Sequence, residues 1–292
     1  MFHRTYVFDV PKRKLNHQSL GKQEQMSLPN FLIIGAPRSG TTWLAMNLRE
    51  HPDIFMPQIK EVHYFDRHYA EGIDYYLKFF RGAESFRAVG EATPDYLYFP
   101  EVPERIASVL PESKMILCLR DPVDRVYSRY WNAKAKYTEN RSLSFEQKLR
   151  QKPLFLDEGK YFTHVKRYYE YFAPEQFLIL SYDEIQSEPD DVMRRAYEFL
   201  DVDSTFRPET LDLRVNAAAS KPHHAKSRSL YYLHRSLEKI GLHALANVVQ
   251  NYNAASLPSM SEETRRWLVE EVYRQENLKL QQLTGLDVSQ WN

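Results

Sequence analysis

The chain has 292 residues, of which 43% are hydrophobic and 27% are charged, a balance typical of globular proteins. Its 39 basic residues equal its 39 acidic residues, which argues against a nucleic-acid partner, because such binders carry excess positive charge. No run reaches the roughly 18 apolar residues that a membrane span needs, so we expect no such span.

The N-terminal segment is polar and lacks the apolar core of a signal peptide. We therefore expect residues 1–29 to form a polar arm and residues 30–292 to form one domain. The single cysteine, Cys118, excludes an internal disulfide and fits a reducing compartment. It lies in the apolar run MILCL, which indicates a buried core position. Together these features predict a cytoplasmic protein.

Apolar runs of strand length occur at 31–34, 114–119 and 177–182, with a weaker one at 87–91. Their apolarity is continuous rather than alternating, as in strands that are covered on both faces. Residues with helical spacing predict helices at about 42–50, 103–110, 121–134, 160–172, 189–200 and 262–284. Asp121 suits the N-cap of the third helix, and Pro122 suits its first helical position. The alternation predicts an α/β fold with a parallel β-sheet flanked by helices on both faces, in a single domain.

The segment GAPRSGTT, residues 35–42, lies between the first strand and the first helix. Gly35 and Gly40 permit close approach of a ligand to the backbone, and the helix that follows directs its N–H groups at an anion. This order of strand, glycine loop, hydroxyl pair and helix predicts a phosphate-binding loop of the P-loop type. Thr41 stands where a nucleoside triphosphatase carries the lysine that reaches the terminal phosphates.

The strand at 114–119 is followed by Arg120 rather than by an acid that could hold magnesium. An arginine at this position offers a bidentate fork to a phosphate group. We therefore expect a site that binds two separate anionic groups through cations and hydroxyls and requires no metal. Two alternatives remain open at this point: a P-loop kinase that uses ATP, and a nucleotide-binding module that has lost catalysis.

Four motifs in order, GAPRSGTT, KEVHYFD, GEATPDYL and LRDPVDRVYSRY, resemble the sulfotransferases that use 3′-phosphoadenosine 5′-phosphosulfate (PAPS). The similarity is to the branch that contains the heparan sulfate O- and N-sulfotransferases, and it spans roughly residues 31–200. It implies in-line transfer of a sulfuryl group from PAPS to an acceptor, with adenosine 3′,5′-diphosphate (PAP) as the other product. We expect the acceptor group to be a hydroxyl, and an amine remains the alternative.

The resemblance also implies a set of donor-binding residues. Arg38 matches the basic loop residue that assists the bridging oxygen of the phosphosulfate, and Arg120 and Ser128 match the pair that binds the 3′-phosphate. The basic segment 214–229 either closes over the donor or is a solvated loop. The residues expected to bind the nucleotide are Arg38, Ser39, Gly40, Thr41, Thr42, Arg120, Ser128, Tyr161, Lys226 and Arg228.

The acceptor hydroxyl must lose its proton, and a carboxylate or an imidazole can accept it. If KEVHYFD is extended, Glu61 and His63 project to the same side. By resemblance, Glu61 matches the general base, and His63 matches a supporting residue that is also the alternative base. Lys60 is expected either to stabilise charge on the sulfuryl or phosphate group, or to form a surface pair with Glu61.

One departure from the family pattern bears on the acceptor. Ala92 stands where the heparan enzymes generally carry a lysine that helps to grip the acidic polysaccharide. This change, together with the zero net charge, weakens the case for a strongly anionic glycan. We therefore expect an acceptor that bears a hydroxyl group, a carbohydrate or another small molecule.

Overall fold

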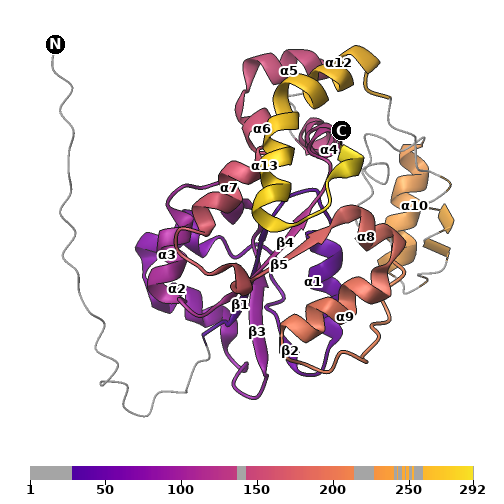
Figure 1. Ribbon diagram of the computed structural model, residues 1–292. Helices are drawn as coiled ribbons and strands as arrows, with labels where there is room; N and C mark the ends of the chain where they lie inside the picture. Colours follow the sequence, from indigo (N-terminus) through magenta and orange to yellow (C-terminus); the bar gives the residue numbers. More distant parts are fainter. Residues whose placement is uncertain are drawn as a thin grey trace.

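The computed structural model describes residues 28–136, 143–213, 227–239 and 259–291, together with positions 242, 245, 246, 248, 249 and 252. The described strands form one parallel sheet in the order β2-β3-β1-β4-β5 (Figure 1). They are β1 (Phe31–Gly35), β2 (Ile54–Phe55), β3 (Ala88–Ala92), β4 (Lys114–Leu119) and β5 (Phe177–Ser181). The sequence predicted all of these except β2, because two residues are too short to carry a hydrophobic pattern.

Helices connect the strands. The α-helices are α1 (Thr41–Glu50), α2 (Ile73–Leu77), α3 (Val102–Val109), α4 (Pro122–Lys136), α5 (Phe145–Gln151), α6 (Leu154–Asp157), α7 (Tyr161–Tyr168), α8 (Tyr182–Ser187), α9 (Pro189–Phe199), α10 (Arg228–Lys239), α12 (Glu262–Trp267) and α13 (Arg274–Thr284). Two π-helical turns, η1 (Tyr64–His68) and η8 (Leu268–Tyr273), and the 3-10 turn η4 (Pro94–Leu97) also bear on the site. The helix predicted at 262–284 is thus interrupted by η8, and the one predicted at 160–172 ends at Tyr168.

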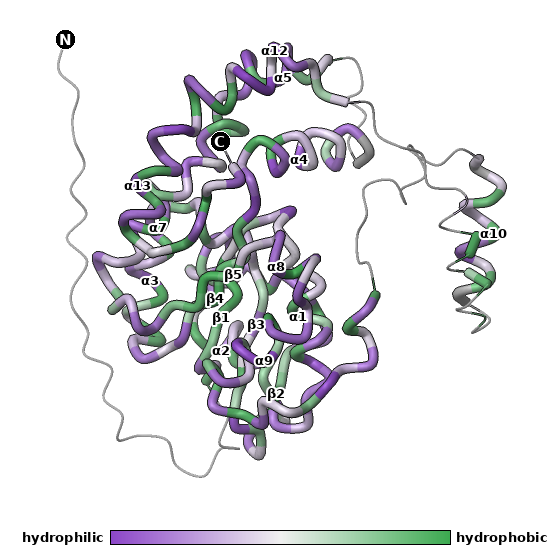
Figure 2. The backbone as a smooth tube through the Cα atoms, turned by 45° about the vertical axis from the view of Figure 1, so that its right-hand side comes forward, coloured by the Kyte–Doolittle hydropathy of each residue, from purple (hydrophilic) through white to green (hydrophobic). Residues whose placement is uncertain are grey.

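Both faces of the sheet are covered, which confirms the predicted α/β fold. Leu32 and Ile34 of β1 pack into one buried cluster with α2, α3, α7 and α13, whereas Phe31 and Ile33 pack into a second with α1, α8 and α9. These four side chains are fully buried. Figure 1 shows the two groups of helices on opposite sides of the sheet, and Figure 2 shows hydrophobic residues along its central strands. Cys118 is buried in β4, as predicted.

A third apolar cluster lies beyond the carboxyl end of the sheet. It joins Val123 and Val126 of α4 to α5 and to Leu268 and Tyr273 of η8. The start of α4 is as predicted, since Asp121 Oδ1 accepts a hydrogen bond from the Val123 N–H at 2.8 Å and Pro122 is the first helical residue. This cluster brings the C-terminal helices next to the strand ends where ligands of such sheets bind.

The predicted polar arm lies almost wholly outside the described residues and stays a prediction. Of the helices that the structure describes, none combines the length and apolarity that crossing a membrane requires.

Candidate active site

The glycine loop connects β1 to the N-terminus of α1. Gly40 caps α1 with φ 96°, and a Cβ at this position would lie 2.9 Å from Cδ1 of Ile185. Glycine is required there both for the left-handed backbone and for the close packing. The N–H groups of the first turn, from Thr41 and Thr42 onward, have no acceptor within the helix, and the positive end of the helix dipole adds to them. The helix start is therefore an anion-binding position.

Two other residues around the loop are turned inward. Ser39 is fully buried, and its backbone N–H donates to the Ala36 carbonyl at 3.3 Å. Its contact with a nucleotide stays a prediction. Trp43 is also buried, and its Nε1 donates to the Leu211 carbonyl at 2.9 Å, so it belongs to the core.

Arg38 links the glycine loop to α4. It has φ 72°, and its Nε donates a hydrogen bond to Oγ of Ser128 at 3.1 Å. Burial lowers the pKa of Arg38, and the charges of Arg120 and Arg129 lower it further. Arg120 and Arg129 are thus close enough to repel the charge of Arg38, and a multiply charged anion would relieve that repulsion.

Arg120 is held from two sides at the end of β4. Its guanidinium lies over the ring of Tyr182, at 4.6 Å from the centroid, and its carbonyl accepts a hydrogen bond from the Tyr161 hydroxyl at 3.0 Å. Tyr161 is only 1% exposed, so it fixes the backbone of Arg120 from within the core. Its predicted contact with a nucleotide stays a prediction. Lys226 lies outside the described residues, and Arg228 begins α10 with its side chain outside the description.

The segment that carries Glu61 and His63 is seated on the end of β3. The Glu61 N–H donates to the Ala92 carbonyl at 3.0 Å, and the His63 N–H donates to Oγ1 of Thr93 at 3.3 Å. The extended backbone considered from the sequence is wrong here, because Glu61 has φ 68° and His63 has φ 54°. These bonds to the strand end hold both residues in a sparsely populated conformation.

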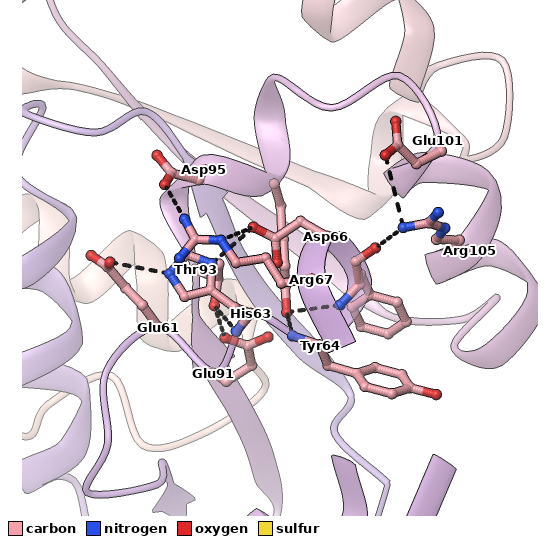
Figure 3. A network of polar contacts seen from close by, with 12 residues as sticks. Glu61, His63, Tyr64, Asp66, Arg67, Glu91, Thr93, Asp95, Glu101 and Arg105 are labelled. Carbon is pink, nitrogen blue, oxygen red and sulfur yellow. Dashed lines mark hydrogen bonds and ion pairs between the residues drawn. The ribbon is translucent and has the colours of Figure 1, made fainter. Parts of the chain in front are cut away.

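The two side chains meet nevertheless. His63 Nε2 lies 3.5 Å from Oε2 of Glu61, and His63 Nδ1 lies 2.8 Å from Oδ2 of Asp66 (Figure 3). Lys60 Nζ lies 2.9 Å from Oε1 of Glu61, so the pair expected as one alternative is present. Lys60 therefore faces the candidate base.

The pKa values separate the two candidate bases. The hydrogen bond from His63 outweighs burial and, with Lys60, lowers the pKa of Glu61 to about 2. Burial opposes charge on His63, but its bonds to Asp66 and Glu61 prevail and raise its pKa to about 9. At neutral pH, Glu61 is a carboxylate that can accept a proton, whereas His63 is an imidazolium that cannot. The arrangement favours Glu61 as the base.

Ion pairs connect the segment that carries Glu61 and His63 to α4. Asp95 on η4 lies 3.3 Å from Nη2 of Arg67 and 3.9 Å from Nη2 of Arg129. Arg67 Nε also lies 3.5 Å from Oδ2 of Asp66, the partner of His63. These ion pairs therefore link His63, through Asp66, Arg67 and Asp95, to Arg129, the residue that follows Ser128. The motifs KEVHYFD, GEATPDYL and LRDPVDRVYSRY contain most of these residues, but their spacing does not reveal which charged residues form ion pairs.

A buried carboxyl group, Glu91, lies beneath the Glu61–His63 segment and was missed from the sequence. It is 1% exposed, and Oγ1 of Thr93 donates to its Oε2 at 2.7 Å (Figure 3). Oγ1 of Thr93 in turn accepts a hydrogen bond from the backbone N–H of His63. The Tyr96 hydroxyl accepts one from the backbone N–H of Tyr64 at 2.9 Å. Burial is the main cause that raises the pKa of Glu91 to about 7. Glu91 thus anchors the hydroxyl that holds His63.

Within the described part of the chain, no three His, Cys, Asp or Glu side chains are grouped as a metal ion would need. The expectation that the reaction requires no metal stays a prediction.

Comparison with known proteins identifies similar sequences. Residues 28–239 match the family model described as the sulfotransferase domain. The chain is 44% identical over 108 residues to the membrane-associated sulfotransferase kil1 of Dictyostelium discoideum, covering 36% of this chain and 23% of that protein. It is 31% identical over 210 residues to human bifunctional heparan sulfate N-deacetylase/N-sulfotransferase 3, covering 64% of this chain and 24% of that protein. The chain thus spans about a quarter of the length of these relatives.

A solved structure supports the fold assignment. A sulfotransferase from Alicyclobacillus acidocaldarius superposes with a TM-score of 0.69 and 26% identity, covering 91% of this chain and 99% of that chain. The predicted resemblance is therefore confirmed. The predicted cytoplasmic location gains no support, since one relative is named membrane-associated, and it stays a prediction.

Proposed function

The chain belongs to the sulfotransferase domain family, and we propose that this sulfotransferase moves a sulfuryl group from PAPS to an acceptor hydroxyl. The hydrogen bond between Arg38 and Ser128 carries the proposal, because it joins the glycine loop to the helix that begins after Arg120. PAPS has two separate anionic groups, a 5′-phosphosulfate and a 3′-phosphate. The loop and the Arg120–Ser128 pair offer two matching sites.

The 5′ end fits the start of α1. There, Gly40, Thr41 and Thr42 would supply N–H groups and hydroxyls to the 5′-phosphate, with Arg38 beside the bridging oxygen. Arg120 and Ser128 would bind the 3′-phosphate, which ATP lacks. The kinase alternative loses its support, since the family is that of sulfotransferases and β4 is followed by Arg120 rather than by a metal-binding acid.

In the proposed reaction, Glu61 accepts the proton of the acceptor hydroxyl as its oxygen attacks sulfur in line. The new sulfur–oxygen bond forms while the bond between sulfur and the bridging phosphate oxygen breaks, and that oxygen keeps the electron pair. Arg38 and Lys60 stabilise the charge that develops on the bridging oxygen and the sulfuryl group.

The low pKa of Glu61 makes it a weak base while His63 donates to it. An acceptor hydroxyl that takes the place of His63 at Oε2 would remove the main cause of that low value. His63 would then turn fully to Asp66, its other partner at 2.8 Å. Binding of the acceptor would in this way activate its own base.

We propose a carbohydrate with few acidic groups as the acceptor class. The similarity to relatives named for heparan sulfate supports a carbohydrate. The residues around Glu61 and His63 support an acceptor with little negative charge. Lys60 and Arg67 already pair with carboxylates of the protein, and position 92 is alanine. An acidic polysaccharide would need unpaired cations at this place.

Calorimetry tests the donor. We expect PAP to bind more tightly than ATP, with no effect of magnesium. Tighter binding of ATP that depends on magnesium would overturn the proposal. Incubation with ³⁵S-labelled PAPS and matched sugars that bear only hydroxyls, a free amine or added sulfates then tests the acceptor class. Preferential labelling of the heavily sulfated sugar would contradict it.

A further inference from the structure

Two carboxylates stand beside the candidate 3′-phosphate site. Asp124, in the first turn of α4, has Oδ2 at 3.7 Å from Nη2 of Arg120. Asp121, the N-cap of α4, immediately follows Arg120. Left uncompensated, both would repel a 3′-phosphate, and Asp124 would compete with it for the Arg120 guanidinium.

One guanidinium from the C-terminal region spans both carboxylates. Arg265 on α12 donates from Nη1 to Oδ1 of Asp124 at 2.8 Å and from Nη2 to Oδ2 of Asp121 at 3.1 Å. These contacts join residues 141 and 144 positions apart in the sequence. Arg265 also lies beyond residues 28–239, which the sulfotransferase family model matches.

The surrounding structure fixes the position of α12. Ser261 caps this helix by accepting the Thr264 N–H at 3.1 Å, and Oγ1 of Thr264 donates to Glu146 on α5 at 3.3 Å. The next turn, η8, buries Leu268 in the cluster that contains Val123 of α4. The fork of Arg265 is therefore placed by packing, which lowers the entropy cost of holding it there.

We propose that Arg265 is a positioning residue of the 3′-phosphate site, which neutralises Asp121 and Asp124 and so leaves Arg120 available to the phosphate. The inference rests on the proposed function, because it takes Arg120 and Ser128 as the 3′-phosphate pair. Arg265 acts through Asp124 and Arg120, and it contributes to the preference for nucleotides that carry a 3′-phosphate.

The test compares the binding of PAP and of adenosine 5′-monophosphate (AMP), which differ only by the 3′-phosphate. We expect Arg265→Gln to weaken PAP binding roughly tenfold and to change AMP binding less than about twofold, since the pairs are partly exposed. Arg266→Gln, on the exposed neighbouring position of α12, is the matched control and should leave both affinities unchanged.

A second variant separates electrostatics from folding. Asp124→Asn removes the competing carboxylate, so the double variant with Arg265→Gln should recover most of the lost PAP affinity. A purely structural role of Arg265 would give no recovery and equal losses for PAP and AMP, and this result would overturn the inference.

The PAP and AMP affinities also separate an error in the 3′-phosphate assignment from an error in the role of Arg265. If the unaltered protein binds PAP no more tightly than AMP, the assignment of Arg120 and Ser128 to a 3′-phosphate is wrong. If it prefers PAP and Arg265→Gln keeps that preference in full, only the role of Arg265 is overturned.

Discussion

Arg38 and Ser128 lie 90 residues apart in the sequence and are joined by a hydrogen bond of 3.1 Å from Nε to Oγ. The bond connects the loop after β1 with the helix after β4, which are neighbouring strands of the sheet. Ser128 lies in the second turn of α4, a helix that begins two residues after Arg120, so this one contact relates the two candidate anion sites to each other. A substitution at either residue should therefore affect the binding of both the 5′-phosphosulfate and the 3′-phosphate of the donor.

Arg38→Ala should lower kcat by about 100-fold or more, because a positioned cation beside the developing charge is lost. The melting temperature should change little, since Arg38 lies in a loop. Arg38→Lys is the matched variant and should keep part of the activity, as it retains the charge but loses the planar fork. Wild-type turnover by Arg38→Ala would contradict this role.

Glu61→Gln should retain PAP binding, measured by calorimetry, and should lower the rate of transfer by about 100-fold to 10,000-fold, as expected when a general base is removed. His63→Asn should be less damaging, because Glu61 would still accept the proton. Should Glu61→Gln keep full activity while His63→Asn is inactive, the base is His63.

The Glu61–His63–Asp66 contacts predict a stability change at alkaline pH. The pKa of His63 is raised from 6.5 to about 9, so the folded state holds this proton more tightly than the unfolded chain does. The stabilisation is complete below pH 6.5 and is lost as the pH rises through about 9. Urea unfolding at several pH values should show this loss in the wild type and not in His63→Asn. Identical pH profiles for the two would refute it.

Glu91 predicts a second change at lower pH. Its pKa is raised from 4.5 to about 7, so its contribution to stability is complete below pH 4.5 and is lost as the pH rises through about 7. The full difference corresponds to about 3 kcal/mol. Glu91→Gln cannot ionise, and its unfolding free energy should lack this component. The same slope between these pH values in both proteins would contradict the prediction.

The pair formed by Arg125 and Glu158 should be important for stability. Arg125 Nη1 lies 3.0 Å from Glu158 Oε2, and their side chains are 0% and 7% exposed. Glu158→Gln leaves a buried guanidinium without its counter-charge and should cost about 3 kcal/mol of unfolding free energy. Glu175→Gln, at an exposed position, is the control and should be neutral. A loss below about 0.5 kcal/mol in Glu158→Gln would contradict a stabilising role of this pair.

Local patterns in the sequence determined much of the fold and the outline of the donor site. Continuous apolar runs predicted four of the strands described, Asp121 and Pro122 predicted the start of α4, and the order of four motifs predicted the family. These features depend on residues close together in the chain, where strand length, helical spacing and capping chemistry act directly.

Tertiary structure alone decided how the charged groups pair. The left-handed backbone at Glu61 and His63 depends on bonds to the end of β3, and the burial of Glu91 depends on the sheet and the turns packed above it. Arg265 reaches Asp121 and Asp124 only because η8 packs against α4. A charged side chain shows no periodicity that identifies its partner, so such pairs follow from the register of the sheet and the packing of distant helices.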